Sequence, residues 1–161
     1  MQDQITLERI KLIHPVLRDE VGDIYNDICK ALTGRAICRF TSTLRTFAEQ
    51  DALFAKGRTK PGGIVTNARA GSSWHNYGMA IDIVLIDGKS TLWDVKKDFD
   101  GDGKSDWIEI VQIFKEYGWE WGGDWKFYDA PHFQKTMGQT IRGMLAKHQW
   151  GKVDKNGFVI L

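Results

Sequence analysis

Apolar side chains recur at helical spacing along much of the chain. In residues 16–32, for example, Val21, Ile24 and Ile28 fall on one face, and a period of about 3.6 residues predicts a helix that packs through that face. Pro15 stops or interrupts the shorter pattern before it. The helices predicted in this way cover residues 6–13, 16–32, 46–56, 107–117 and 140–148.

Two other stretches predict strands. Residues 36–43 alternate with β-branched and aromatic side chains, and residues 79–86 form a nearly continuous apolar run, as strands of a half-buried or buried sheet do. Residues 57–71 are rich in glycine and predict a loop with a short extended piece at residues 64–66. The C-terminal tail ends in a possible edge strand.

Length and composition narrow the picture. A chain of 161 residues is expected to form one domain, residues 1–161, large enough to bury a core. Its 22 lysines and arginines balance 21 acids. The net charge therefore gives no indication that the protein binds nucleic acid or an anionic membrane. Cys29 and Cys38 are too few for a disulfide framework and predict a buried, reduced pair. The seven tryptophans either pack the protein or line a groove for a sugar–peptide polymer.

A histidine and a carboxylate, His75 and Asp82, stand seven residues apart within residues 73–82. Zinc accepts imidazole and carboxylate ligands, and a catalytic zinc uses three protein ligands plus a water. The remaining ligand is expected to be a second histidine with an acid nearby. The chain supplies that pair near its other end as Asp129 and His132.

The pattern Ser-x-His-x-x-Gly-x-Ala-x-Asp at residues 73–82, followed by an acid three residues before a histidine, resembles the zinc D-Ala-D-Ala carboxypeptidases. That group includes VanY-like enzymes and the L-alanyl-D-glutamate endopeptidases of phage lysins and cell-wall hydrolases. The shared positions outside the pattern are Arg45, Gln50, Leu53, residues 57–59 and residues 119–125. The resemblance therefore covers residues 39–134 in the family's order.

The resemblance implies a fold and a mechanism. The fold is α+β, with a small antiparallel sheet, packed helices and a zinc cleft, and a catalytic core at about residues 36–136. His75, Asp82 and His132 are the expected zinc ligands. Asp129 is the expected general base, which takes a proton from the zinc-bound water and passes it to the leaving amine. Many relatives carry the longer glutamate at that position.

The resemblance also implies a substrate, the peptide stem of bacterial peptidoglycan. It places Arg45, Gln50 and Ser73 at the substrate, where an arginine fork suits a peptide carboxylate. Arg45 and Gln50 have an alternative interpretation as solvated helix residues. The compact chain favours an L-alanyl-D-glutamate endopeptidase over a D-Ala-D-Ala carboxypeptidase. A non-catalytic, calcium-stabilised cell-wall binding module is the alternative from another class.

A second metal motif occupies residues 98–109. It matches the twelve-residue EF-hand loop, with acids at positions one, three, five and nine, glycine at six and glutamate at twelve. Position seven contributes only its backbone carbonyl, so a lysine is acceptable there. The expected Ca²⁺ ligands are Asp98, Asp100, Asp102, Lys104, Asp106 and Glu109. The alternative interpretation is an acidic surface turn.

Localisation and partners follow from the same observations. The N-terminus shows neither a basic start nor an apolar core of a signal peptide, and no apolar run approaches the length of a membrane span. We therefore expect a monomer with no nucleic-acid or membrane partner. It would be made in the cytoplasm and reach the cell wall after release, as phage lysins do, or be secreted with a signal absent from this chain. Residues 137–161 predict a C-terminal extension.

Overall fold

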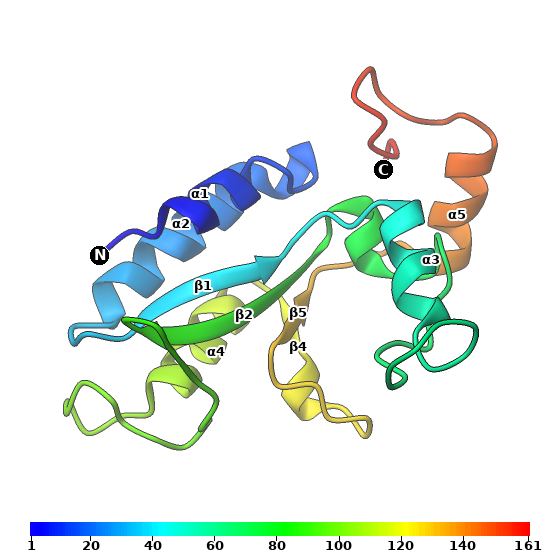
Figure 1. Ribbon diagram of the computed structural model, residues 1–161. Helices are drawn as coiled ribbons and strands as arrows, with labels where there is room; N and C mark the ends of the chain where they lie inside the picture. Colours follow the sequence, from blue (N-terminus) through cyan, green and yellow to red (C-terminus); the bar gives the residue numbers. More distant parts are fainter.

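The computed structural model describes all 161 residues (Figure 1). Five α-helices and five strands alternate irregularly along the chain, with two short 3₁₀ segments. The elements are α1 (Gln4–Ile10), α2 (Pro15–Ala31), β1 (Ile37–Ser42), α3 (Phe47–Ala55), η1 (Trp74–Tyr77), β2 (Ala80–Asp87), β3 (Ser90–Leu92), α4 (Asp106–Glu116), β4 (Glu120–Trp121), η2 (Gly122–Asp124), β5 (His132–Gln134) and α5 (Ile141–Gln149).

The strands form one small sheet in the order β1-β2-β5-β4, with β3 also paired to β2. Every pairing is antiparallel, as expected. β2 is the central strand. At its beginning, Asp82 lies opposite Ser42 of β1 on one side and opposite His132 of β5 on the other. This register places Asp82 beside His132, two of the residues of the candidate site.

Alternation along β2 and β5 divides the sheet into two faces, because successive side chains of a strand point to opposite sides. Ile81 and Ile83 are fully buried in a cluster of 25 core residues. Phe133 of β5 lies in the same cluster and stacks on Phe114 of α4, with ring centroids 4.1 Å apart. Asp82 and His132 therefore lie on the face opposite this core.

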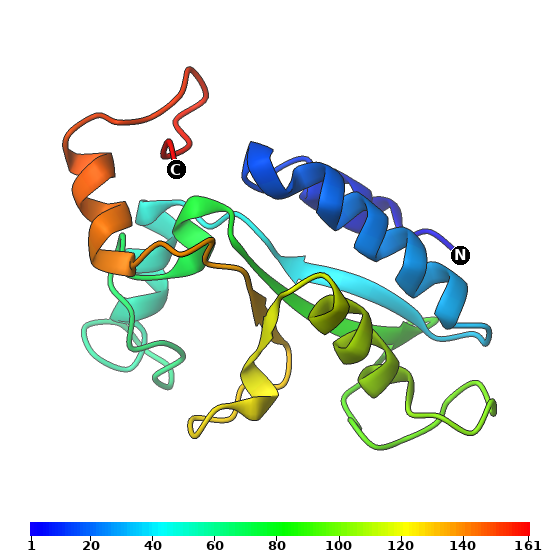
Figure 2. The same cartoon turned by 180° about the vertical axis from the view of Figure 1, so that it is seen from behind.

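Helices α1, α2 and α4 contribute many of the other core residues, and Figure 2 shows α2 and α4 lying next to each other against the long β1–β2 pair. Tyr25 of α2 packs edge-on against Phe40 of β1. At the other end of that pair, α3 and α5 lie beside the loop that leads into η1 (Figures 1 and 2). No helix is long and apolar enough to cross a membrane.

Most predicted elements are present with shifted ends. The first helix begins earlier than predicted because Asp3 caps it by accepting the Thr6 N–H. His14 caps α2 in the same way, accepting the N–H of Val16 at 3.2 Å, so this histidine is structural. Residues 64–66 form no strand, and the C-terminal tail forms only an isolated bridge between Val153 and Val159.

Helix α3 differs from the prediction in its buried face. Its apolar residues were expected to point inward, yet its one fully buried residue is Gln50. Of the two cysteines, both are free; Cys38 is buried as predicted, whereas Cys29 is only partly buried.

Candidate metal centre

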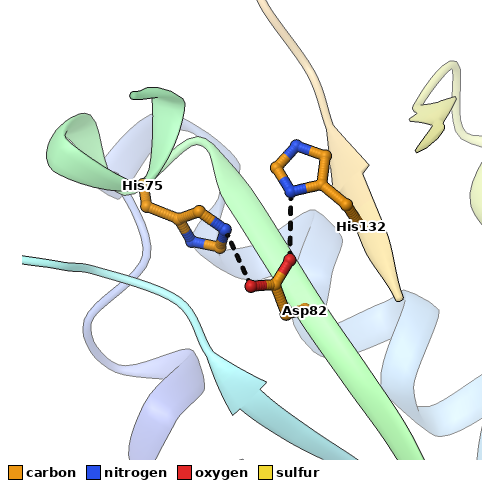
Figure 3. Close-up of side chains that lie close together, drawn as sticks. All are labelled: His75, Asp82 and His132. Carbon is orange, nitrogen blue, oxygen red and sulfur yellow. Dashed lines mark hydrogen bonds and ion pairs between the residues drawn. The ribbon is translucent and has the colours of Figure 1, made fainter. Parts of the chain in front are cut away.

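His75, Asp82 and His132 meet on one face of the sheet (Figure 3). His75 comes from η1, Asp82 from β2 and His132 from β5. The Nε2 atom of His75 lies 3.2 Å from Asp82 Oδ2, and the Nδ1 atom of His132 lies 3.0 Å from Asp82 Oδ1. One candidate ligand atom from each residue lies within 4.8 Å of the other two. The three ligands predicted from sequence are therefore brought together.

The position of His75 is fixed by a short turn and by one backbone acceptor. Ser73 caps η1, and Gly78 ends it in the left-handed conformation, φ 68°. The Nδ1 atom of His75 lies 2.8 Å from the carbonyl oxygen of Thr43. A carbonyl can only accept, so Nδ1 carries the proton and Nε2 keeps its lone pair. That Nε2 is buried and has no hydrogen-bonding partner.

His132 is oriented by a side chain. Its Nε2 atom lies 2.9 Å from Gln134 Oε1. The amide nitrogen of Gln134 donates to Glu120 Oε2 at 3.3 Å, which leaves the amide oxygen to face the ring. Nε2 of His132 therefore carries the proton, and Nδ1 directs its lone pair toward Asp82.

Two bare ring nitrogens thus face the two oxygens of one carboxylate. At such distances the lone pairs of nitrogen and oxygen repel each other unless a positive charge lies between them. A buried nitrogen without a hydrogen-bonding partner also costs free energy of folding. A divalent cation relieves both problems at once. Two imidazoles and one carboxylate are also the three-ligand set of a catalytic zinc, with one position left for water. The residues present therefore fit a metal ion.

The pKa of Asp82 is set by burial and by its two histidine neighbours. Burial alone would raise its pKa, but the two adjacent histidines outweigh burial and hold the pKa well below its usual value. For His132, burial lowers the pKa, but the adjacent Asp82 carboxylate raises it overall. The centre therefore keeps Asp82 ionised and able to bind a cation.

Asp129 lies in the same cavity as the three ligands. Burial is the main cause that raises its pKa, and the charge of Asp82 adds to it, against the two histidines. A carboxylate with a raised pKa is suited to take up and return a proton near neutral pH. Asp129 therefore shares the cavity of the candidate ligands, and its role as the base stays a prediction.

Three hydrogen bonds to backbone atoms hold the segment around Asp129. The N–H of Asp129 donates to Gly122 O at 2.9 Å, and the carbonyl of Asp129 accepts from the N–H of His132 at 3.1 Å. Trp121 Nε1 donates to Ala130 O at 2.7 Å. Residue 122 must be glycine, because a Cβ there would lie 2.3 Å from the carbonyl oxygen of Asp129.

The predicted substrate residues occupy different depths. Arg45 and Ser73 line the cavity, whose volume is about 360 Å³. The Arg45 guanidinium lies 3.6 Å from Asp82 Oδ2. Gln50 lies behind it, fully buried; its Oε1 accepts from Arg45 at 3.1 Å and its amide donates to Ala68 O at 2.8 Å. Gln50 therefore holds Arg45 and the loop wall in place and does not line the cavity.

A larger cavity, about 470 Å³, lies elsewhere, lined by residues such as Leu12, Phe47 and Phe158. It contains none of the residues predicted to act in catalysis or metal binding. Its size does not make it the reaction site, because the ligands and the candidate base all line the smaller cavity. We therefore assign the chemistry to the smaller one.

The predicted EF-hand-like segment, residues 98–109, forms an open loop followed by the first turn of α4, which contains Asp106 and Glu109. Asp98 accepts the N–H groups of Gly101 and Gly103, the latter at 2.8 Å. Gly103, at the sixth position, has φ 91°, a conformation that suits glycine. Two groups of carboxylates in the loop could hold a metal ion, Asp98 with Asp100 and Asp106, and Asp100 with Asp102 and Glu109.

Two carboxylate oxygens of this loop lack partners. Asp106 is fully buried and its Oδ1 has no hydrogen bond, and Oδ2 accepts from the N–H of Phe99 at 2.7 Å. Oε2 of Glu109 is likewise buried and unpaired. Burial and neighbouring carboxylates raise the pKa of both acids. These two oxygens are therefore able to accept a hydrogen bond or a cation that no other residue of the protein supplies.

Two groups that orient the histidines were not predicted from the sequence. The carbonyl of Thr43 has no sequence signature, because any residue at that place would supply it. Gln134 could have been found: it stands two residues after His132 in a strand, so the two side chains share a face.

Comparison with known proteins agrees with this site. Residues 66–135 match the family model described as D-alanyl-D-alanine carboxypeptidase. This segment contains all three candidate ligands and Asp129. The predicted family resemblance is confirmed.

The names of individual relatives specify the bond that those proteins cleave. The chain is 56% identical over 97 residues to the peptidoglycan L-alanyl-D-glutamate endopeptidase CwlK of Bacillus subtilis, covering 58% of each chain. It is 38% identical over 63 residues to the L-alanyl-D-glutamate peptidase of Listeria phage A118, covering 38% of this chain and 20% of that one. The chain thus spans less than two thirds of the length of each of these curated relatives.

A solved structure supports the fold. The L-Ala D-Glu endopeptidase ChiX of Serratia marcescens superposes with a TM-score of 0.54 at 21% sequence identity, covering 83% of this chain and 88% of that one. The mixed fold with a small antiparallel sheet is therefore shared with that protein.

Proposed function

We propose that this protein is a zinc metallopeptidase that hydrolyses the L-alanyl-D-glutamate bond in the peptide stem of bacterial peptidoglycan. The observation that carries the proposal is the pair of bare histidine nitrogens directed at Asp82, beside Asp129 in one cavity. The family match and the names of CwlK and the phage enzyme support the reaction and the bond.

His75, Asp82 and His132 would hold the zinc. When bound, zinc supplies a water whose pKa is lowered to about 7 and polarises the scissile carbonyl. Asp129 accepts the proton of the attacking water and delivers it to the leaving amine of D-glutamate. Its raised pKa favours the first of these transfers, in which the carboxylate takes up the proton.

Arg45 supplies the positive charge of the cavity. Its guanidinium is held by Gln50 and by Ser42 Oγ at 3.3 Å, so it does not need to be ordered when substrate arrives. We propose that it binds a carboxylate of the peptide stem, for which a guanidinium fork is suited. Ser73 lies on the same wall and is proposed as a polar contact to the peptide.

Digestion of purified peptidoglycan, followed by mass analysis of the fragments, tests the proposal. New amino-terminal D-glutamate would identify the endopeptidase. Release of free D-alanine alone would identify the carboxypeptidase that the description of the family model names. Protein that binds no zinc and releases neither product would instead be a cell-wall binding module, and the proposal would be wrong.

We further propose that residues 98–109 bind Ca²⁺. The buried, unpaired oxygen of Asp106 and the buried oxygen of Glu109 support this, because calcium takes six to eight oxygen ligands and would satisfy both. Asp100 ties the loop to the body of the protein, accepting the N–H and hydroxyl of Thr33 at 3.0 Å each. Calorimetric titration of metal-stripped protein with Ca²⁺ tests this proposal directly.

A further inference from the structure

Glu120, Gln134 and His132 form a chain of hydrogen bonds across the edge of the sheet. Glu120 on β4 lies directly opposite Gln134 on β5, and His132 precedes Gln134 by two residues on the same face. The Gln134 amide donates to Glu120 at 3.3 Å, and its oxygen lies 2.9 Å from His132 Nε2.

We propose that Gln134, held by Glu120, is a positioning residue that keeps the proton of His132 on Nε2, so that Nδ1 is the atom offered to the metal. This inference rests on the metal centre of the proposed function and extends it to two residues outside the ligand set.

The direction of the amide decides the tautomer. An amide can present either its oxygen or its nitrogen to an imidazole, and the two choices favour opposite tautomers. The carboxylate of Glu120 accepts hydrogen bonds only, so it selects the orientation in which the Gln134 nitrogen faces outward. The oxygen then faces His132, whose Nε2 must donate.

The other histidine ligand has no such dependence. Nδ1 of His75 donates to the backbone carbonyl of Thr43, which no side-chain substitution removes. The tautomer of His132 therefore depends on side chains, and that of His75 does not. Partners that orient a metal-binding histidine are commonly worth about 10–100-fold in metal affinity or activity.

The test compares zinc affinity, measured by competition with a chromophoric chelator, in four proteins. Gln134→Leu removes the acceptor. The double exchange Glu120→Gln with Gln134→Glu rebuilds the chain of hydrogen bonds, with the carboxylate now next to the imidazole of His132. Gln139→Leu is the matched control, because Gln139 is also partly buried and its Oε1 accepts from Lys147 at 3.2 Å, outside the site.

We expect Gln134→Leu to weaken zinc binding by about 10–100-fold. The double exchange should restore most of this loss, and the control should not change the affinity. Nitrogen NMR of the zinc-loaded, histidine-labelled protein should show the His132 proton on Nε2 in the unmodified chain and in the double exchange, and should show loss of that single state in Gln134→Leu.

Unchanged affinity in Gln134→Leu, or a bare Nε2 on His132 in the unmodified protein, would overturn the proposal. A purely structural role for Gln134 would lower the melting temperature of the metal-free protein without changing the tautomer, and that result would also overturn it. Protein that binds zinc through Nδ1 but does not cleave peptidoglycan would contradict the proposed function and leave this inference standing.

Discussion

The two candidate metal sites are assembled in opposite ways. The histidine centre collects its ligands from three elements, and its Asp82–His132 contact joins residues 50 positions apart. The acidic loop draws all of its candidate ligands from one stretch of twelve residues, 98–109. The first site depends on the sheet being formed, whereas the second depends mainly on local turns.

Their charges differ as well. In the histidine centre a single carboxylate stands between two imidazoles, and the pKa of Asp82 is lowered. In the loop, carboxylates face one another, and the pKa values of Asp106 and Glu109 are raised, first by burial and then by neighbouring acids. The two candidate sites therefore differ in the kind of charge they gather: the histidine centre sets one carboxylate between two imidazoles, whereas the loop sets carboxylates against one another.

Removal of a ligand from the histidine centre should have the largest effect. We expect His75→Ala or His132→Ala to abolish zinc binding and to reduce peptidoglycan hydrolysis to background, with the fold retained, because these side chains lie on the face opposite the main core. Metal analysis and fragment mass spectrometry measure both. His148→Ala is the control, since that exposed histidine contacts Phe47 and not the centre. Normal turnover in chelated buffer would refute the assignment.

Substitution of the base should have the next largest effect. We expect Asp129→Asn to retain zinc, because Asp129 is not among the ligands, and to lower kcat by about 10²–10⁴-fold through loss of proton transfer. Zinc content and initial rates of stem-peptide cleavage are the measurements. Loss of zinc in this variant would instead make Asp129 a ligand, and the base would have to be another residue.

Calcium should act mainly on stability. Binding to the folded state adds RT ln(1 + [L]/Kd), about 2.7 kcal/mol at a hundredfold excess, which corresponds to roughly 5–10 °C in Tm for a chain of this size. We expect calcium to raise Tm and also to strengthen zinc retention, because α4 leads from the loop to β4, which pairs with the strand bearing His132.

Glu109→Gln should weaken both effects of calcium by removing the bidentate ligand. Glu116→Gln is the control, since this exposed residue lies at the other end of α4. A melting temperature that ignores millimolar calcium, in protein first stripped of it, would show that the loop is only an acidic turn.

The smallest effect concerns pH. An acid whose folded-state pKa is raised destabilises the folded protein at neutral pH, and this penalty fades as pH falls through the raised value. The calcium-free loop, through Asp106 and Glu109, should therefore gain relative stability on mild acidification, while protons compete with bound calcium. We expect the Tm difference between calcium and chelator to shrink from neutral pH toward pH values near the ordinary range of carboxylates, about 4. A constant difference would contradict this.

The features predictable from sequence were those encoded by neighbouring residues. Helical periodicity located α2 and α4 because their buried faces repeat within a few turns, and the spacing of the acids located the loop at residues 98–109. The ligands of the histidine centre lie far apart in the chain, and His132 was joined to Asp82 only by the three-ligand rule for zinc and by the family resemblance.

Other features required the structure. The buried position of Gln50 arises because its amide bridges Arg45 and a loop carbonyl, which overrides the preference for apolar residues inside α3. The tautomers of His75 and His132 depend on acceptors from Thr43 and Gln134, and hydrogen-bond directions of this kind depend on the three-dimensional placement of strands.

Strand β5 has only three residues, and this brevity gives the metal a role in strand alignment. A slip of β5 by one residue would turn His132 toward the core and Phe133 toward the cavity, because side chains alternate between faces. Phe133 resists the slip by stacking on Phe114, and a metal bound to His132 would resist it from the other face. A bound metal would thus stabilise the correct alignment of β5 relative to the slipped one, because the slipped strand could not bind it.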